Sequence, residues 1–159
     1  MRNINGILDY QKSDQEDVAA VVGADFTNAT AVLLDIVGLS LPLLGYSTYA
    51  FEACISAGVS ADVNGACFAV GFDGAAGANL EAQILGTLTA ASAIAERIFA
   101  ILTGTTALLT TVSQDGAIMI RGIITTQADP GNLTIQVNHP TAGTTTIYIG
   151  SYLRTVKVE

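Results

Sequence analysis

Hydrophobic and polar residues alternate along most of the chain from Thr30 onward, a pattern typical of half-buried β-strands. The alternation is most regular from Gly116 to Glu159. Three runs rich in β-branched residues lie there, over residues 116–126, 133–137 and 144–156, separated by the turn sequences 129–132 and 139–143. This spacing predicts three consecutive antiparallel strands.

Further strand patterns precede this segment. They cover residues 30–36, 39–44, 48–55, 65–72, 80–88 and 105–112. Pro42 places the second of these runs at a sheet edge or a bend, because proline cannot donate to a strand ladder. Residues 91–102 fit both a helical stripe and a strand, and the strands on both sides favour a strand. The pattern predicts an all-β, antiparallel sandwich or barrel of eight to ten short strands.

The run 65–72 has two unlike faces. One carries Phe68, Val70 and Phe72, and the other carries only Cys67, Ala69 and Gly71. A face of small residues predicts that another layer or subunit packs closely against it.

The two cysteines, Cys54 and Cys67, would face each other if residues 48–56 and 65–73 formed a hairpin. A disulfide is then possible by geometry, although directly cross-strand bridges are strained and a cytoplasmic product stays reduced. We favour two free thiols that fill close-packed space.

The first 28 residues differ from the rest of the chain. They hold its one dense polar run, from Tyr10 to Asp17, and no strand alternation surrounds it. Such a segment is either a frayed terminus or an arm that lies along a neighbouring subunit. We therefore divide the chain into an extended N-terminal arm, 1–28, and a β-domain, 29–159.

Composition adds an expectation of assembly. The chain has 159 residues, of which 50% are hydrophobic and 13% charged, whereas an average soluble domain has roughly 25% charged residues. A single domain of 16.3 kDa with mean hydropathy +0.51 has little charge to cover its surface. We expect an oligomer, the alternative being a monomer whose Thr, Ser and Gly residues supply uncharged polarity.

The net charge of −8 argues against direct contact with nucleic acid or anionic lipid, since both require a basic surface. The most apolar stretch, 29–44, is interrupted by Asp35, Gly38 and Pro42 and is too short for a membrane span. The acidic N-terminus does not resemble a signal peptide. We expect assembly in a cytoplasm.

Candidate catalytic residues are scarce. The single histidine, His139, precedes Pro140 in a turn, where we expect a solvated side chain with no ligand role. The Asp-Gly sequences lack the spacing of calcium loops, and no Gly-x-Ser-x-Gly elbow is present. We expect neither an enzyme nor a cofactor or metal site.

Several of these segments together resemble structural proteins of tailed-bacteriophage virions. They are Gly38-Leu39, Tyr49-Ala-Phe-Glu52, Gly65-Ala-Cys-Phe-Ala-Val70, Met119-Ile-Arg-Gly122 and the closing run from Thr144 to Val156, which contains Gly150-Ser-Tyr-Leu-Arg154. The resemblance spans roughly Thr30 to Val156. It implies a jelly roll similar to the trimeric tumour-necrosis-factor-like heads of virion spikes, fibres and decoration proteins.

A chain of this length without a fibrous shaft looks more like a capsid decoration (cement) protein than a tail fibre. The resemblance implies a homotrimer on the capsid exterior, assembled in the host cytoplasm, with the major capsid protein as its partner. The expected subunit contacts are Cys67, Ala69, Gly71, Arg121, Tyr148, Tyr152 and Arg154, the two arginines each reaching a carboxylate at the subunit boundary. The candidate capsid contacts are Tyr10, Lys12, Asp14, Glu16 and Asp17 of the arm.

Two other interpretations remain open at this stage. A receptor- or glycan-binding head of a phage fibre or spike would use the same fold. A small-barrel binding module unrelated to viruses, such as a lipocalin-like carrier, is also compatible with the apolar composition. The chain has, however, no tryptophan for the lipocalin Gly-x-Trp motif.

Overall fold

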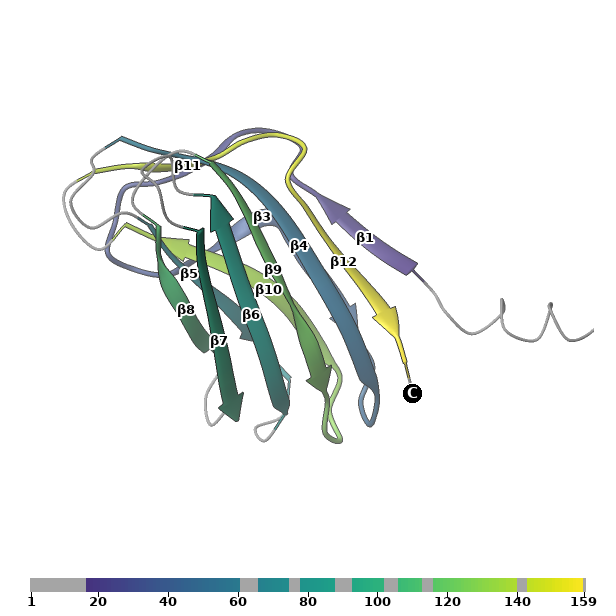
Figure 1. Ribbon diagram of the computed structural model, residues 1–159. Coiled ribbons are helices and arrows are strands. Elements are labelled where there is room, and N and C mark those ends of the chain that lie inside the picture. Colours follow the sequence, from purple (N-terminus) through teal and green to yellow (C-terminus); the bar gives the residue numbers. More distant parts are fainter. Residues whose placement is uncertain are drawn as a thin grey trace, which may run out of the picture.

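Every element in the described part of the chain is a β-strand in this computed structural model (Figure 1). The structure describes residues 17–60, 66–74, 78–87, 93–101, 106–112, 116–139 and 143–158. Their strands are β1 (Asp17–Val21), β2 (Phe26–Asn28), β3 (Leu34–Leu43), β4 (Thr48–Val59), β5 (Ala66–Phe72), β6 (Asn79–Thr87), β7 (Ala93–Ile101), β8 (Thr106–Val112), β9 (Gly116–Thr125), β10 (Gly131–Asn138), β11 (Thr145–Ile147) and β12 (Tyr152–Lys157).

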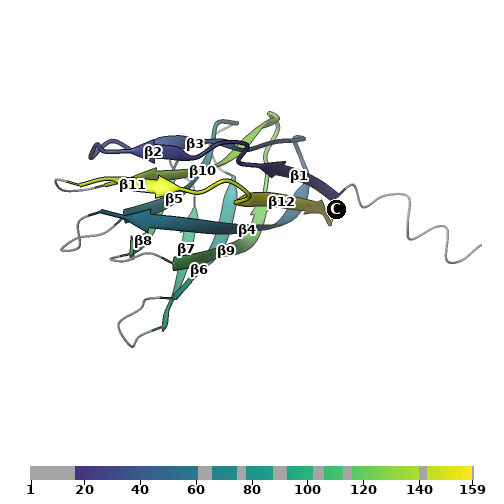
Figure 2. The same cartoon turned by 90° about the horizontal axis from the view of Figure 1, so that it is seen from above.

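The strands form two antiparallel sheets that face each other (Figures 1 and 2). The larger sheet has the order β1-β12-β4-β9-β6-β7, with the short strand β11 beside β4 and β2 beside β11. The smaller sheet has the order β3-β10-β5-β8. Figure 1 shows the larger sheet running from β7 at one edge to β1 at the other.

The connections identify the fold as a jelly roll. From β3 to β10 the chain crosses repeatedly between the sheets, so that β3-β10-β5-β8 form one group and β4-β9-β6-β7 form the other. Two four-stranded groups related in this way make a jelly-roll sandwich. The strands β12 and β1 extend the larger sheet past β4. The predicted all-β, antiparallel jelly-roll sandwich is confirmed.

The core lies between the sheets and follows the alternation of the sequence. Phe68 on β5, Ile55 on β4, Ile120 on β9 and Ile135 on β10 are completely buried there. The bulky face predicted for residues 65–72 therefore points inward, which buries the largest apolar side chains of both sheets against each other.

Crossing connections separate strands that follow one another in the sequence. The three closing runs do form strands, but β9 pairs with β4 and β6, whereas β10 pairs with β3 and β5, so they are not neighbours. The hairpin considered for 48–56 and 65–73 does not form, because β4 and β5 belong to different sheets. Cys54 and Cys67 consequently lie in different sheets, and no disulfide joins them.

Two local predictions about strands are confirmed. Residues 93–101 of the ambiguous segment form the strand β7. Pro42 lies in β3, which is the edge strand of the smaller sheet. A bulge interrupts β3 at Gly38, whose φ of 93° suits glycine and whose Cα faces the Val21 carbonyl so closely that a Cβ would lie 2.7 Å from its oxygen.

More strands are present in the described residues than the eight to ten expected, partly because β1 and β2 lie within the segment interpreted as an arm. β1 pairs with β12, from Asp17 opposite Val156 to Val21 opposite Tyr152. Asp17 thus begins the sheet. The other candidate capsid contacts, Tyr10, Lys12, Asp14 and Glu16, lie outside the described residues.

Candidate functional site

The outer surface of the larger sheet combines apolar side chains with a group of polar ones. Inward positions on β4, β9 and β12 are buried, and the alternate positions point away from the core. Together with Val21 of β1 they form what we call the apolar face, made of Val21, Ala50, Cys54, Met119, Ile123 and Val156. Ile123 is 50% exposed and Val21 is 55% exposed. Apolar side chains gathered on one sheet surface are typical of a contact with another protein.

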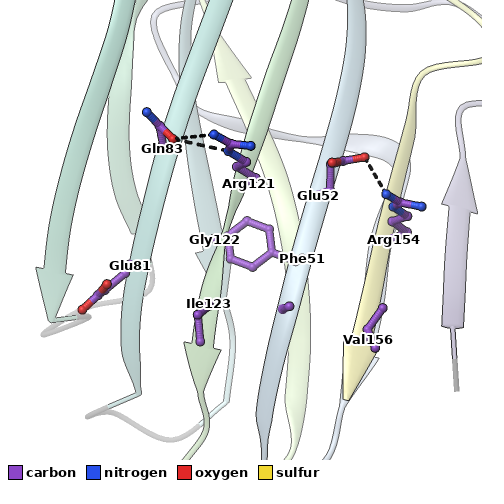
Figure 3. Close-up of a pocket in the computed structure, with 10 residues that line it drawn as sticks. Phe51, Glu52, Glu81, Gln83, Arg121, Gly122, Ile123, Arg154 and Val156 are labelled. Carbon is purple, nitrogen blue, oxygen red and sulfur yellow. Dashed lines mark hydrogen bonds and ion pairs between the residues drawn. The ribbon is translucent and has the colours of Figure 1, made fainter. Parts of the chain in front are cut away.

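A concavity of about 630 Å³ opens within this face (Figure 3). Ala50, Ile123 and Val156 line it together with polar side chains of β4, β6, β9 and β12. Gly122 accounts for part of its shape, because a Cβ there would meet the Glu81 carbonyl and the ring of Phe51. The missing side chain lets the Phe51 ring lie directly beneath β9.

The polar groups of the concavity include an ion pair and several side-chain hydrogen bonds. Arg154 forms an ion pair with Glu52, with Nη2 3.0 Å from Oε1. The Tyr152 hydroxyl donates to the same carboxylate oxygen at 3.2 Å. Arg121 donates through Nε and Nη2 to the Gln83 side-chain oxygen at 3.3 and 3.2 Å. The surface therefore offers planar, partly neutralised hydrogen-bonding groups among apolar side chains.

Two expectations for the arginines differ from this geometry. Arg154 does reach a carboxylate, but it is Glu52 of its own chain. Arg121 donates to the amide oxygen of Gln83 instead of a carboxylate. Both arginine side chains are exposed, so they still have donors left for a further partner.

Tyr152 is held in its protonated form. Desolvation, the hydrogen bond to Glu52 and the negative charge of Glu52 all raise the pKa of Tyr152 above its ordinary 10.0. At neutral pH the phenol is thus a hydrogen-bond donor that is already engaged.

The smaller sheet carries polar side chains on β3 and β10, and its edge strand β3 also exposes Leu34 and Val37. The polar residues form what we call the polar face: Asp35 and Ser40 of β3 with Thr134 and Gln136 of β10. Gln136 donates to Asp35 Oδ1 at 2.7 Å. This network lies over the small residues of β5.

The predicted small face of β5 belongs to this surface. Ala69 is completely buried and Gly71 is buried as well. A Cβ on Gly71 would lie 2.6 Å from Thr134 Oγ1 and 3.1 Å from the amide carbon of Gln136. The layer that packs closely over Ala69 and Gly71 thus includes side chains of the neighbouring strand β10. Cys67, at the end of the row, is partly exposed.

The predicted subunit contacts are therefore divided between two opposite surfaces. Arg121, Tyr152 and Arg154 come together on the larger sheet, and Cys67, Ala69 and Gly71 lie on the smaller one. Tyr148 belongs to neither surface, because it stands 39% exposed in the turn after β11.

His139 does not have the solvated environment that its turn sequence predicts. Its side chain is completely buried. Nδ1 lies 3.1 Å from Thr145 Oγ1, and the backbone N–H donates to the Thr30 carbonyl. Asn28 explains the burial, because its amide donates to the carbonyls of Val32 and Val137 and draws these loops over the end of the sandwich. Within the described residues, Nε2 has no hydrogen-bond partner.

Over the described ranges of the chain, no three His, Cys, Asp or Glu side chains gather closely enough to hold a metal ion. In the same residues, no helix has the length and apolarity needed to cross a membrane.

Sequence reasoning missed Glu52, Gln83 and Ile123 as members of one site. Their outward positions could be derived from the alternation, but their proximity depends on the order β12-β4-β9-β6, which joins strands far apart in the chain. The one local signal was charge: Glu52, Arg121 and Arg154 are isolated ionic residues within otherwise neutral strands.

The sequence matches no protein-family model and no curated protein. Among solved structures, the chain is similar to the Eiger tumour necrosis factor of S. frugiperda, with 10% identity, 90% of this chain and 93% of that chain covered, and a TM-score of 0.41. It is also similar to a family two carbohydrate esterase from Cellvibrio japonicus, with 10% identity, 87% of this chain covered and a TM-score of 0.38, but it spans only 35% of that chain. The infectious bursal disease virus VP2 subviral particle gives 11% identity, covering 91% and 40% of the two chains, with a TM-score of 0.25. Likenesses this remote carry no functional argument, and the strand order alone defines the fold.

Proposed function

We propose that this chain is a structural virion protein, namely a capsid decoration protein that stabilises the outer capsid surface as a homotrimer. The observation that carries the proposal is the apolar face, in which a concavity opens and Arg154 pairs with Glu52 of its own chain. The resemblance of residues 30–156 to tailed-phage structural proteins supplies the virion context.

The division of the predicted contacts bears on how a trimer could close. A ring of three needs two contact surfaces inclined toward each other on every subunit, whereas contacts on opposite faces generate an open filament. The apolar face and the polar face lie on opposite sides of the sandwich, so they cannot both serve one closed trimer. We assign the threefold axis to the apolar face, whose two halves would supply the two inclined surfaces, because its concavity offers a shape that neighbouring copies can fill and the water-exposed Ile123 and Val21 gain from burial.

Burial against neighbouring copies also suits the polar groups of this face. Tyr152 and Glu52 are already bonded to each other, so the hydroxyl and one carboxylate oxygen would enter the interface satisfied. Arg121 and Arg154 are the groups with spare donors, and an arginine fork readily finds carbonyl or carboxylate oxygens at an interface.

A decoration protein needs no catalysis, since it strengthens a shell by burying surface across capsomers. The major capsid protein is the proposed partner, on the virion exterior, and Tyr10, Lys12, Asp14, Glu16 and Asp17 remain proposed capsid contacts. The net charge of −8 is consistent with a protein that stands outside the shell and does not contact packaged nucleic acid.

Mass measurement by light scattering and binding to purified capsid shells that lack this protein test the proposal. We expect a particle of three 16.3-kDa chains that saturates the shells and raises their melting temperature. A monomer, or shells left unbound and unstabilised, contradicts it. Binding to host cells or glycans in place of shells would instead support the fibre-head alternative.

A further inference from the structure

The loop between β3 and β4 presents apolar side chains to solvent at one end of the sandwich. Tyr46 is 79% exposed and Leu44 is 61% exposed. Tyr46 also has a φ of 50°, a left-handed conformation that is disfavoured for a bulky side chain. Burial cannot explain this residue, because the exposed ring contributes little to the core. Disfavoured backbone conformations persist where the surrounding structure imposes them, and they gather at functional sites.

The neighbouring loop between β9 and β10 imposes this conformation. The Tyr46 N–H donates to the Gln127 carbonyl at 2.8 Å. Thr126 Oγ1 donates to the Leu44 carbonyl at 2.7 Å and accepts from the Ser47 N–H at 3.0 Å.

Two further contacts hold the same loop in place, one with Tyr49 and one with Ala128. The Leu44 N–H donates to the hydroxyl of Tyr49, whose ring belongs to the core. Gly45 packs directly against the Ala128 carbonyl, where a Cβ would collide. The loop is therefore held on both sides of Tyr46, and the ring is presented from a fixed backbone.

A fixed, exposed aromatic side chain beside an aliphatic one is the arrangement of an interface anchor. Tyrosine has few side-chain torsions to immobilise, so a ring held in place in advance binds with little loss of entropy. We propose that Tyr46, with Leu44 beside it, is the anchor that this chain inserts into an apolar pocket of the major capsid protein. This inference rests on the proposed decoration function and adds the surface through which the trimer docks.

The polar groups around the loop favour a protein partner over a glycan. Asp73 and Asn132, at the same end of the sandwich, bond to each other through the side-chain amide and the backbone N–H of Asn132. Sugar sites need several free donors and acceptors around the aromatic ring, and these groups are engaged. Leu44 offers nothing to a polyhydroxyl ligand, whereas it extends the apolar surface that a protein pocket covers.

The charged residues around the loop indicate which side chains lie at the edge of the partner's pocket. Asp129 is exposed and follows Ala128, which packs against Gly45. Asp73 is exposed nearby, where Gly74 packs against Gly131. Two carboxylates thus flank the apolar loop on a chain of net charge −8. The complementary pocket carries Lys or Arg at its edge, and association weakens as salt rises.

Tyr46→Asn separates docking from folding. Asparagine tolerates a left-handed backbone better than tyrosine, so we expect an unchanged or higher melting temperature and an unchanged trimer mass. Binding to shells of the major capsid protein that lack this chain should fall at least about tenfold, as for loss of an aromatic anchor. Asp129→Asn should weaken binding severalfold and reduce its salt dependence.

Val32→Ser is the matched control. Val32 is 64% exposed in the loop that precedes β3, at the other end of the sandwich, and its replacement should leave shell binding unchanged. Shell binding by a folded, trimeric Tyr46→Asn protein at the wild-type affinity overturns the anchor while leaving the decoration function intact. Wild-type protein that fails to bind shells overturns the function and the anchor together. Binding to a glycan array that depends on Tyr46 would replace the protein pocket with a sugar ligand.

Discussion

The outer surfaces of the two sheets differ in how far side chains of the same chain cover them. On the smaller sheet, Gln136 reaches across to Asp35, and β10 side chains cover the small residues Ala69 and Gly71. On the larger sheet, Ile123 lines a concavity and is half exposed, as is Val21 at the edge of the sheet. Side chains of the same chain cover the smaller sheet over β5, and its exposed apolar side chains, Leu34 and Val37, lie on the edge strand β3.

This difference teaches that a row of small or neutral residues does not by itself identify an interface. The small face of β5 looked like a contact surface, yet the adjacent strand of the same chain fills much of the space above it. The informative property is what remains exposed after neighbouring strands have paired. By that criterion the region over β5 is already covered, whereas the larger sheet and the edge strand β3 keep apolar area available for a partner.

The largest expected effect comes from placing a charge on the apolar face. Ile123→Asp would place a second carboxylate directly opposite Glu81 of β6 and bury it in the proposed trimer contact, at a cost of about 3 kcal/mol or more. We expect the mass in light scattering to fall from three chains to one at micromolar protein concentration. Because Ile123 is half exposed in the single chain, the secondary structure seen by circular dichroism should be retained.

Val37→Asp is the control for this exchange. Val37 lies on β3 of the other sheet and is 73% exposed, so the same change there should leave the mass unaltered. Dissociation by Val37→Asp together with an intact Ile123→Asp trimer would reverse the assignment of the two faces.

Two glycines sharpen the comparison by their effect on stability. A Cβ on Gly122 would collide with the Glu81 carbonyl and the Phe51 ring, both fixed within the larger sheet and core. Gly122→Ala should therefore lower the free energy of unfolding by about 1–3 kcal/mol.

Gly71→Ala is the matched change in the smaller sheet. Its Cβ would meet the side chains of Thr134 and Gln136 and no backbone atom among its nearest neighbours, so the loss should be smaller than for Gly122→Ala. Urea unfolding of both variants gives the two values. Equal losses would mean that the layer over Gly71 is as rigid as the core.

The sequence predicted what depends on alternation and missed what depends on connections. Strand positions and the inward set Phe68, Val70 and Phe72 follow from a period of two and needed no knowledge of neighbours. Sheet membership did not follow, because β9 and β10 are adjacent in the chain but belong to different sheets. A short turn can close a hairpin or cross between sheets, and its residues look alike in both cases.

The candidate site shows the same limit at the level of single residues. Arg121, Arg154 and Tyr152 stood out as polar residues in neutral strands, and the structure brings these three to one surface. Their partners Glu52 and Gln83 come from strands whose pairing cannot be read from the sequence. His139 was misjudged because its burial depends on Asn28, over a hundred residues earlier in the chain, which ties down the loops around it.

A smaller effect should appear at alkaline pH on the apolar face. Because the folded protein raises the pKa of Tyr152 above 10.0, the stability gained from the protonated phenol is present below that pH and is lost as pH rises through the raised pKa. Glu52→Gln removes the carboxylate charge, so the pKa of Tyr152 should move back toward its ordinary value. Tyrosinate absorbance during an alkaline titration should therefore rise at lower pH than in the wild type. An identical titration curve would mean that burial alone sets this pKa.

The smallest expected effect lies at acid pH, beside the polar face. Hydrogen bonds from the side chain and backbone of Asn132 lower the pKa of Asp73 below its ordinary 3.8. The stability that the ionised carboxylate contributes is thus present above pH 3.8 and is lost as pH falls through the lowered pKa, the reverse of Tyr152. Asn132→Ala should make the melting temperature fall less steeply as the pH is lowered. In a protein that already carries Asp73→Asn, the same substitution should not change how steeply the melting temperature falls. Because Asp73 is exposed and therefore screened, the change should be small. If Asn132→Ala changed the acid slope equally in both backgrounds, the slope would come from a group other than Asp73. The opposite pH responses of the two sheets could then no longer be explained by the pairs Asp73–Asn132 and Tyr152–Glu52.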